Sequence, residues 1–389
     1  MTRGGAQEEE LCAMKVAVLG GTGFVGARLV EVLLLNGIDA VAAVRNPKRP
    51  RDIMVDLRDP MTFRVLDPFD YVVDIASADT LALAQYCLVR DKIFLSGTSD
   101  HVIVERLLEL YGSSGRGLVV LGAGLFPGIS NLAAVSATRR VKDVTSIQVG
   151  VCLSPLSGAG AGITQLMGDA LQRPYLSRVR GKIEVGPSIA RGPKLRFSSG
   201  RRRMMRAALA DTQLLLTSTT VPNLNVFLAI RPVLMTLAFL ATPMFVLTSS
   251  WFGAMTRWLF RFLRGRVFRV RPTPVEITAE ARGSSDVTTI FATTSDGMLA
   301  TAHALAAVIR IESKRAWGER PTGCLTIDEC YSLEEVVETM RELGSDIAVE
   351  VHDEVLPASD GGPRAFLTTA RHSQVVPRPD RSVGRAMNE

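Results

Sequence analysis

The chain lacks the residue patterns of several common protein classes. Its five cysteines and four histidines are scattered over 389 residues, without a C-x-x-C pair or a histidine at metal-ligand spacing. A metal site is therefore not expected, and the odd number of cysteines is typical of a reduced, cytoplasmic protein. The acidic N-terminus has no apolar segment behind it, so residues 1–13 are interpreted as a disordered tail and not as a secretory signal.

Other missing motifs narrow the function further. The formal charge is +6, yet no helix-turn-helix, zinc-finger or RNA-binding motif occurs, so nucleic acid is not expected as a partner. None of the five tyrosines is followed by a lysine four residues later, which disfavours reductases that use a Tyr-x-x-x-Lys pair. Because 47% of the residues are hydrophobic, the chain can bury a hydrophobic core and is not a disordered protein. Its length of 389 residues favours two domains. Residues 373–389 lack hydrophobic periodicity and are expected to be a second disordered tail.

What is present at the start is a strand, a glycine-rich turn and a helix between Lys15 and Gly37. Glycines in this context permit a tight turn and let backbone N–H groups reach a pyrophosphate. The predicted cofactor contacts of the turn are Gly20, Gly21, Thr22, Gly23, Phe24, Val25 and Gly26. Further apolar strands are predicted at 40–45, 53–55, 70–76, 92–97 and 117–124. These elements predict an α/β fold with a doubly wound parallel Rossmann sheet over residues 14–135.

The end of the second strand predicts which dinucleotide is bound. An NAD enzyme places Asp or Glu there for the ribose 2′-hydroxyl, whereas this chain has Arg45 and Asn46, followed by further basic residues. NADP(H) is therefore the predicted cofactor, although a solvated arginine loop that accepts both cofactors stays open. The other predicted contacts are Asp56 on the adenine side, and Ala76 and Ser77 near the nicotinamide half.

A second, α+β substrate domain is predicted over residues 136–372. Its expected strands are SIQVGVCL, KIEVG and VEITAEARG, and residues 225–265 are expected to form a hydrophobic and amphipathic helical insertion. Helices are predicted at 296–311 and 332–343, with 322–326 as an extended link between them. Packing of these last helices on the Rossmann domain stays open.

Several motifs together resemble the saccharopine dehydrogenase-like NAD(P)-binding oxidoreductases. They are VAVLGGTGFVGARLV, VVDIAS, YCLVRDKIFLSG and, above all, GAGLFPGISNLAA at 122–134. The resemblance implies an NADP-linked reductase whose substrate lies between the two domains. Phe126 and Pro127 are then candidate substrate contacts, as are Ser157 and Thr164 at the ends of a glycine-rich stretch that a plain turn explains equally well.

No residue stands out as catalytic. Asp211 and His303 are weak candidates, and a lone histidine in an apolar helix is more often structural. Hydride transfer needs mainly positioning against the cofactor, so such an enzyme can work with a modest proton donor. The predicted function is an NADPH-dependent oxidoreductase that reduces a C=C, C=N or C=O bond in a hydrophobic or lipid-like small molecule. The alternative is a non-catalytic, membrane-associated NADP-binding sensor or scaffold.

The segment 233–252 carries no charge and is followed by an amphipathic stretch with a basic face. Residues expected at a membrane surface are Arg257, Trp258, Arg261 and Arg264. A spanning helix, a monotopic hairpin and a buried helical pair all fit the pattern. The monotopic hairpin is favoured because a spanning helix would split the substrate domain, and a homodimer contact through the same segment stays open.

Overall fold

The computed structural model describes residues 14–76, 78–153, 173–231 and 274–355, together with Val233, Thr236, Leu240, Trp251, Met255 and Trp258. Both expected tails therefore lie outside the described residues. The same holds for six residues singled out from the sequence, which are Ser77, Ser157, Thr164, Arg257, Arg261 and Arg264.

The first sheet has seven parallel strands and the strand order of a doubly wound fold. From one edge to the other it runs β3 (Ile53–Met54), β2 (Asp39–Val44), β1 (Lys15–Leu19), β4 (Tyr71–Asp74), β5 (Ile93–Ser96), β6 (Leu118–Leu121) and β15 (Gly323–Thr326). The predicted parallel Rossmann sheet is confirmed. The stretch expected as an extended link near residue 322 is in fact its seventh strand, because Gly323–Thr326 pairs in register with β6.

Helices cover both faces of this sheet, which explains why its strands are apolar at consecutive positions. Val16 and Val18 pack on one face with Leu29 of α2 (Phe24–Leu35), and α11 (Gly297–Lys314) contacts α2 there. Ala17 and Leu19 face the opposite side, which is covered by α3 (Leu81–Val89), α4 (His101–Leu107) and the short 3-10 helix η1 (Pro60–Leu66). Alternate side chains of one strand thus enter two different cores.

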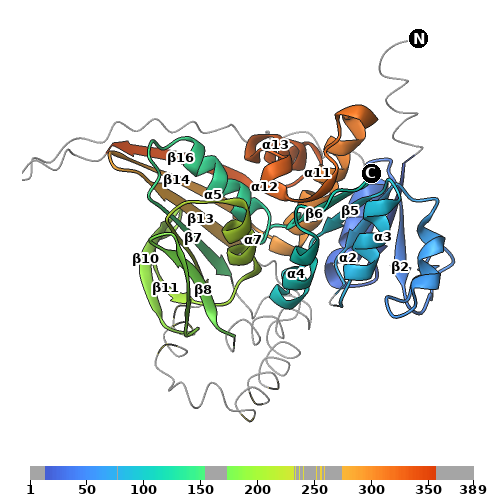
Figure 1. Ribbon diagram of the computed structural model, residues 1–389, viewed down its shortest axis with the longest axis horizontal. Helices are drawn as coiled ribbons and strands as arrows, with labels where there is room; N and C mark the ends of the chain where they lie inside the picture. Colours follow the sequence, from blue (N-terminus) through green and yellow to red (C-terminus); the bar gives the residue numbers. More distant parts are fainter. Residues whose placement is uncertain are drawn as a thin grey trace, which may run out of the picture.

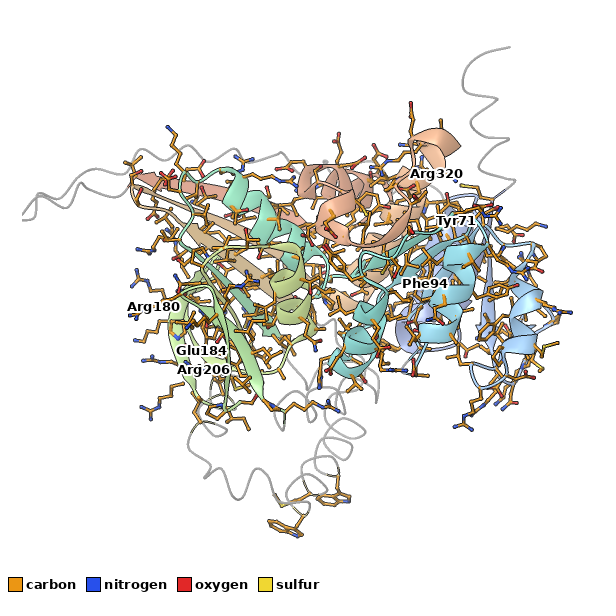
Figure 2. The ribbon with its side chains drawn as sticks, in the orientation of Figure 1. Tyr71, Phe94, Arg180, Glu184, Arg206 and Arg320 are labelled. Atoms are coloured by element: carbon orange, nitrogen blue, oxygen red, sulfur yellow. The ribbon has the colours of Figure 1, made fainter. Side chains whose placement is uncertain are left out.

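The second sheet has nine strands and is mixed. Its main path runs β10 (Arg191–Phe197), β11 (Gly200–Arg206), β12 (Asn223–Ile230), β7 (Ser146–Leu153), β13 (Val275–Arg282), β14 (Asp286–Thr294) and β16 (Ala348–Val355). The hairpin of β8 (Tyr175–Val179) and β9 (Lys182–Gly186) joins at β12. Figure 2 labels Arg180, Glu184 and Arg206 at this end of the molecule, on the side opposite to Tyr71 and Phe94.

Three strands of this sheet coincide with sequence predictions, namely β7, β9 and β13. The helical insertion predicted over 225–265 is wrong for residues 225–230, because these belong to β12, which pairs with β7 along its whole length; most of the rest of that range lies outside the described residues. Val226, Leu228 and Ile230 enter the core, so the alternating pattern of a strand outweighs the apolar run that follows. None of the helices that the structure describes combines the length and apolar character needed to cross a bilayer.

One continuous core joins the two sheets, which lie side by side in Figure 1. Helix α5 (Ile129–Arg139) follows β6 and packs against β13, β14 and β7. It contacts α7 (Ala210–Ser218), α12 (Ile327–Cys330) and α13 (Leu333–Glu342) as well. At the start of α11, a Cβ built on Gly297 would lie 2.4 Å from Val275 Cγ2 and 3.5 Å from Leu125 Cδ2. The start of β13 therefore meets the turn after β6, beside the carboxyl edge of the first sheet.

Candidate functional site

A pocket of about 770 Å³ opens at the carboxyl ends of β1, β2 and β4. This is where the strand order of a doubly wound sheet reverses and where such folds bind ligands. The lining includes six predicted cofactor residues, Gly20, Thr22, Arg45, Asn46, Asp56 and Ala76. Sequence reasoning missed Leu57, Arg58, Asp79, Leu81, Gln85 and Arg106, which also line it.

At the glycines of the turn after β1, neighbouring backbone atoms occupy the space that a side chain would need. A turn packed this closely fits a dinucleotide. Gly20 has a φ of +73°, and a Cβ on Gly21 would lie 2.7 Å from Ala42 Cα in β2. A Cβ on Gly26 would lie 2.2 Å from the Gly20 carbonyl oxygen, so only glycine lets α2 start this close to β1. The helix has no side-chain N-cap hydrogen bond and no acidic residue in its first turn. Its amino end is therefore suited to an anionic group.

Arg45 follows β2 directly and is exposed in the pocket lining. Two acidic residues near Arg45 in the sequence are engaged in local contacts. Asp52 accepts hydrogen bonds from the backbone N–H groups of Lys48 and Arg49 at 3.2 and 3.0 Å, and Asp39 forms an ion pair with Arg51. The end of β2 thus offers a cation to a ligand and keeps these carboxylates in local contacts.

Two aspartates in the lining are also held by their neighbours. Asp56 Oδ1 accepts a hydrogen bond from the Arg58 N–H at 3.0 Å. Asp79 Oδ1 accepts the Leu81 N–H at 3.0 Å, and Asp79 Oδ2 lies 3.5 Å from Arg106 Nε. With Arg45, Arg58 and Arg106 against these two carboxylates, cations outnumber acids in the lining. The pocket lining is therefore suited to a phosphate.

Asp74 is a buried carboxyl group that sequence reasoning missed. It ends β4 and has no exposed surface. Its Oδ1 accepts the Ala76 N–H at 3.0 Å and its Oδ2 accepts the Thr80 hydroxyl at 2.8 Å. Burial raises the pKa of this carboxyl to about 7. Asp74 thereby fixes the loop between β4 and α3 that forms one wall of the pocket. An Asp at the end of an apolar strand was the signal available in the sequence.

The remaining candidates do not line the pocket. Phe126 is half-buried and Pro127 buried in the turn after β6, where the bond between them is cis. Asp211 is buried in the first turn of α7 and accepts a hydrogen bond from the Ser130 hydroxyl, while burial raises its pKa to about 6. His303 lies in α11, where burial lowers its pKa and Asp346 opposes that shift. The structure therefore brings neither weak catalytic candidate to the dinucleotide pocket.

The comparisons with known proteins agree with the fold of the first sheet. Residues 16–119 match the model of the NAD dependent epimerase/dehydratase family. A search of the curated proteins found no match. The family match covers β1 to β6 and supports an NAD(P)-binding Rossmann domain in an NAD(P)-dependent oxidoreductase. The narrower resemblance to saccharopine dehydrogenase-like enzymes is not confirmed by it.

Several solved structures are similar to parts of the chain. The UDP-N-acetylglucosamine 4-epimerase from Bacillus cereus is 24% identical, with 21% of this chain and 39% of that one covered and a TM-score of 0.18. A short chain dehydrogenase from Leptospira borgpetersenii with bound NAD+ is 18% identical over 23% and 52% of the two chains, with a TM-score of 0.20. An oxidoreductase from Sinorhizobium meliloti is 10% identical over 86% and 99%, with a TM-score of 0.37. The chain spans about half or less of the length of the first two, and none of these TM-scores is high enough to support an inference about the site.

Proposed function

We propose that the protein is an NADPH-dependent oxidoreductase that reduces a C=C, C=N or C=O bond in a hydrophobic small molecule. The observation that carries this proposal is Arg45 in the pocket at the end of β2, where an NAD enzyme has an acid. Arg58 lines the same pocket and adds a second cation for a 2′-phosphate. The neighbouring Asp52 is held by backbone N–H groups.

The residues of the pocket fit the parts of this cofactor in order. The turn from Gly20 to Gly26 would receive the pyrophosphate, Arg45 and Arg58 the 2′-phosphate, Asp56 the adenine side and Ala76 the nicotinamide half. The bound nicotinamide supplies the hydride. The chain contributes orientation, because Asp74 holds the loop at Ala76, and it contributes an apolar boundary near the turn that carries Phe126.

Calorimetric titration with NADPH and NADH tests the cofactor assignment directly. We expect the full-length protein to bind NADPH at least about tenfold more tightly, and Arg45→Asp to abolish or reverse that preference because a carboxylate repels the 2′-phosphate. Arg49→Asp makes the same charge change four residues further on, outside the pocket lining, and should leave the preference in place. Equal affinities for both nucleotides, unchanged in Arg45→Asp, would refute the NADPH assignment.

Oxidation of NADPH in the presence of carbonyl, imine and enoyl compounds separates an enzyme from a non-catalytic binding protein. Consumption of NADPH with one class of compound identifies the bond that is reduced. Steady NADPH absorbance with every compound, in a protein that binds NADPH, would instead favour a sensor or scaffold. No histidine, tyrosine, lysine or cysteine occurs among the described lining residues, which is the observation in favour of this second candidate.

We further propose contact with an anionic membrane surface through the segment expected to be amphipathic. Trp251, Met255 and Trp258 have the i, i+4, i+7 spacing of one helix face, and Trp251 and Trp258 are 66% and 63% exposed. The sequence from 252 to 273 carries six arginines and no acidic residue. Flotation with anionic liposomes tests this, with Trp251→Ala/Trp258→Ala expected to lose most binding. Equal flotation of this variant and the wild type would contradict the proposal.

A further inference from the structure

The positive charge of the protein is concentrated in two hairpins of the large sheet. Residues 173–206 contain eleven arginines and lysines and a single acid, Glu184, whereas the whole chain has a net charge of only +6. These residues form the β8–β9 hairpin and the β10–β11 hairpin. The two are joined, because the Arg206 N–H donates to the Ala190 carbonyl at 2.9 Å and the Ile189 N–H donates to the Arg206 carbonyl at 2.8 Å. The remainder of the chain is therefore slightly acidic.

One side of the β10–β11 hairpin consists of exposed cations. In the register of the two strands, Lys194 lies opposite Arg203, and Arg196 lies opposite Arg201. All four side chains are exposed, and we call them the basic face. The apolar side chains that alternate with them along the strands are buried on the other side, namely Leu195, Phe197 and Met204. The alternation shows that the four cations share one side of the hairpin.

This arrangement of charges is unfavourable in the free protein. Side chains directly opposite each other in an antiparallel pair have Cβ atoms about 5 Å apart, and like charges at such positions destabilise a sheet. Among the residues that the structure describes, Arg196 alone of the four has an acidic partner, Glu354, at 3.0 Å. Lys194, Arg201 and Arg203 repel one another with no carboxylate between them. An anionic partner at the basic face would offset this repulsion.

The neighbouring β8–β9 hairpin adds apolar surface. Ile183 and Val185 are 62% and 67% exposed, and they point to the same side of β9 because they are two residues apart. Lys182 beside them is exposed too. Figure 2 shows Arg180, in the turn of this hairpin, at the same end of the molecule as Arg206 of β11. Exposed aliphatic side chains among cations fit a membrane surface, where cations meet anionic headgroups and apolar side chains enter the layer below.

Two features favour a membrane over a nucleic acid as the partner. The two aromatic residues of these hairpins, Tyr175 and Phe197, are 1% and 2% exposed, so neither ring can stack on a base. The hairpin also starts where the chain leaves the large sheet toward Trp251, because Arg231 after β12 donates from Nη2 to the Ser199 hydroxyl at 3.4 Å. Tryptophan side chains concentrate at the membrane–water interface.

We infer that the basic face of the β10–β11 hairpin binds the headgroups of an anionic lipid bilayer. The inference goes beyond the proposed reductase function, since it does not involve the dinucleotide pocket. The same cations have two opposing effects, because they attract the bilayer and destabilise the free protein. Neutralising two of them should therefore weaken binding to anionic vesicles and leave the free protein as stable as before, or more stable. A purely structural role of these residues would not produce that combination.

Sedimentation of the full-length protein with vesicles tests this inference. We expect phosphatidylcholine vesicles with about 30% phosphatidylserine to be bound at least about tenfold more tightly than pure phosphatidylcholine, and less tightly as NaCl rises from about 0.05 to about 0.5 M. Lys194→Gln/Arg203→Gln should lose roughly 10- to 30-fold in affinity for the anionic vesicles, with no loss of stability in urea. Arg90→Gln/Arg116→Gln removes two exposed cations of the Rossmann domain and is the matched control, which should bind nearly as the wild type does.

Three results would overturn the inference. They are equal binding to neutral and anionic vesicles, unchanged affinity in Lys194→Gln/Arg203→Gln, and tighter binding of single-stranded RNA than of anionic vesicles with the same loss in this variant. The last result would assign the basic face to nucleic acid. Arg201→Gln/Arg203→Gln repeats the test if the first variant does not fold.

Two further measurements separate this inference from the other proposals. NADPH titration of the Lys194→Gln/Arg203→Gln protein should give the wild-type affinity, so a wild type that binds NADPH but no vesicles refutes only the membrane contact. The NaCl dependence of vesicle binding should persist in Trp251→Ala/Trp258→Ala, because the basic face is intact there. Loss of that dependence in the tryptophan variant would place the electrostatic contact in the segment at 251–258 and contradict this inference.

Discussion

Two turns at the carboxyl edge of the same sheet look alike in sequence and differ in what fills them. The turn after β1 and the turn after β6 are both rich in glycine, and each opens a helix, α2 and α5 respectively. At the first, the helix start has no side-chain cap, and Thr22 and Phe24 are exposed. At the second, Ser130 and Asn131 are completely buried at the start of the helix.

The protein's own polar groups occupy the second helix start. Asn131 Oδ1 accepts the Gly128 N–H at 3.3 Å, and the Ser130 hydroxyl donates to Asp211, a carboxylate from α7. A helix amino end attracts an anion. In α5 the Ile129 and Ser130 N–H groups already donate to the Gly124 and Leu125 carbonyl oxygens, and Asp211 accepts from the Ser130 hydroxyl. The start of α2, by contrast, has no side-chain cap. The comparison teaches that a glycine-rich turn becomes a binding site only where no side chain from elsewhere in the chain completes it.

We call the turn after β6 the filled turn and the turn after β1 the open turn. The largest effect is expected for Gly128→Ala in the filled turn. Gly128 has a φ of +145°, and a Cβ there would lie 1.8 Å from the Gly124 carbonyl oxygen. Backbone strain and overpacking together should lower the free energy of unfolding by about 3 kcal/mol or more, measured by urea denaturation. Gly112→Ala, at a φ of +72° with no atom within 4 Å, is the control and should lose only about 1 kcal/mol. Similar losses of stability in both variants would show that the turn at Gly128 can adjust to an added Cβ.

Gly26→Ala in the open turn should mainly affect binding. The added Cβ would press on the Gly20 carbonyl oxygen and move the start of α2 away from β1. We expect NADPH affinity to fall about a hundredfold, together with a loss of about 1–3 kcal/mol in stability. Gly37→Ala, at the other end of α2 with no atom within 4 Å of the new Cβ, should bind NADPH normally. A Gly26→Ala protein that keeps wild-type affinity would contradict the role assigned to this turn.

Much of the first sheet could be predicted from sequence because its signals are local. The strand, the glycine turn and the helix at 15–35 are contiguous, and apolar runs mark β2, β4, β5 and β6. The pairing of β15 with β6 could not be predicted, because it joins segments about two hundred residues apart and a strand of four residues, GCLT, carries no register signal. The same limit hid β12 in the expected insertion, where apolar strand and helix look alike over short stretches.

The site residues, like the strands, could be predicted where their signal is local. Residues next to a recognised strand end, such as Arg45 and Ala76, line the pocket. Arg106 was missed because it enters from α4, and Asp74 because a buried carboxyl group is identified by its surroundings. The Asp211 side chain meets Ser130 across 81 residues of sequence, so its role in filling the second turn required the structure.

Protonation of Asp211 should make the filled turn sensitive to pH. Its pKa is raised by burial to about 6 in the folded protein, above the ordinary value, so its contribution to stability is fully present below about pH 4 and is lost as the pH rises through about 6. Asp211→Asn should therefore gain about 1–2 kcal/mol over the wild type at pH 7.5 and nothing at pH 4. Urea denaturation at both values measures this difference. Asp74, whose pKa is also raised, titrates in both proteins, so its contribution cancels from the difference in stability between them.

Ser130→Ala provides the opposing variant of the same contact. It removes the hydroxyl that lowers the pKa of Asp211 and should destabilise the protein more at pH 7.5 than at pH 4, where the carboxyl is neutral. A stability difference between Asp211→Asn and wild type that does not vary with pH would show that the pKa of Asp211 is the same in the folded and unfolded protein, and it would contradict the raised pKa.

The smallest effect is expected for Arg58→Ala, and it sharpens what the open turn binds. Arg58 is exposed and lines the pocket beside Asp56, so its interaction with a 2′-phosphate is screened by water and should contribute about 1 kcal/mol or less, a loss of up to about fivefold in NADPH affinity. NADH affinity should not change, because NADH lacks that phosphate. Arg64→Ala, on η1 outside the lining, is the control. Equal weakening of NADPH and NADH by Arg58→Ala would place this arginine at the pyrophosphate, in the open turn itself.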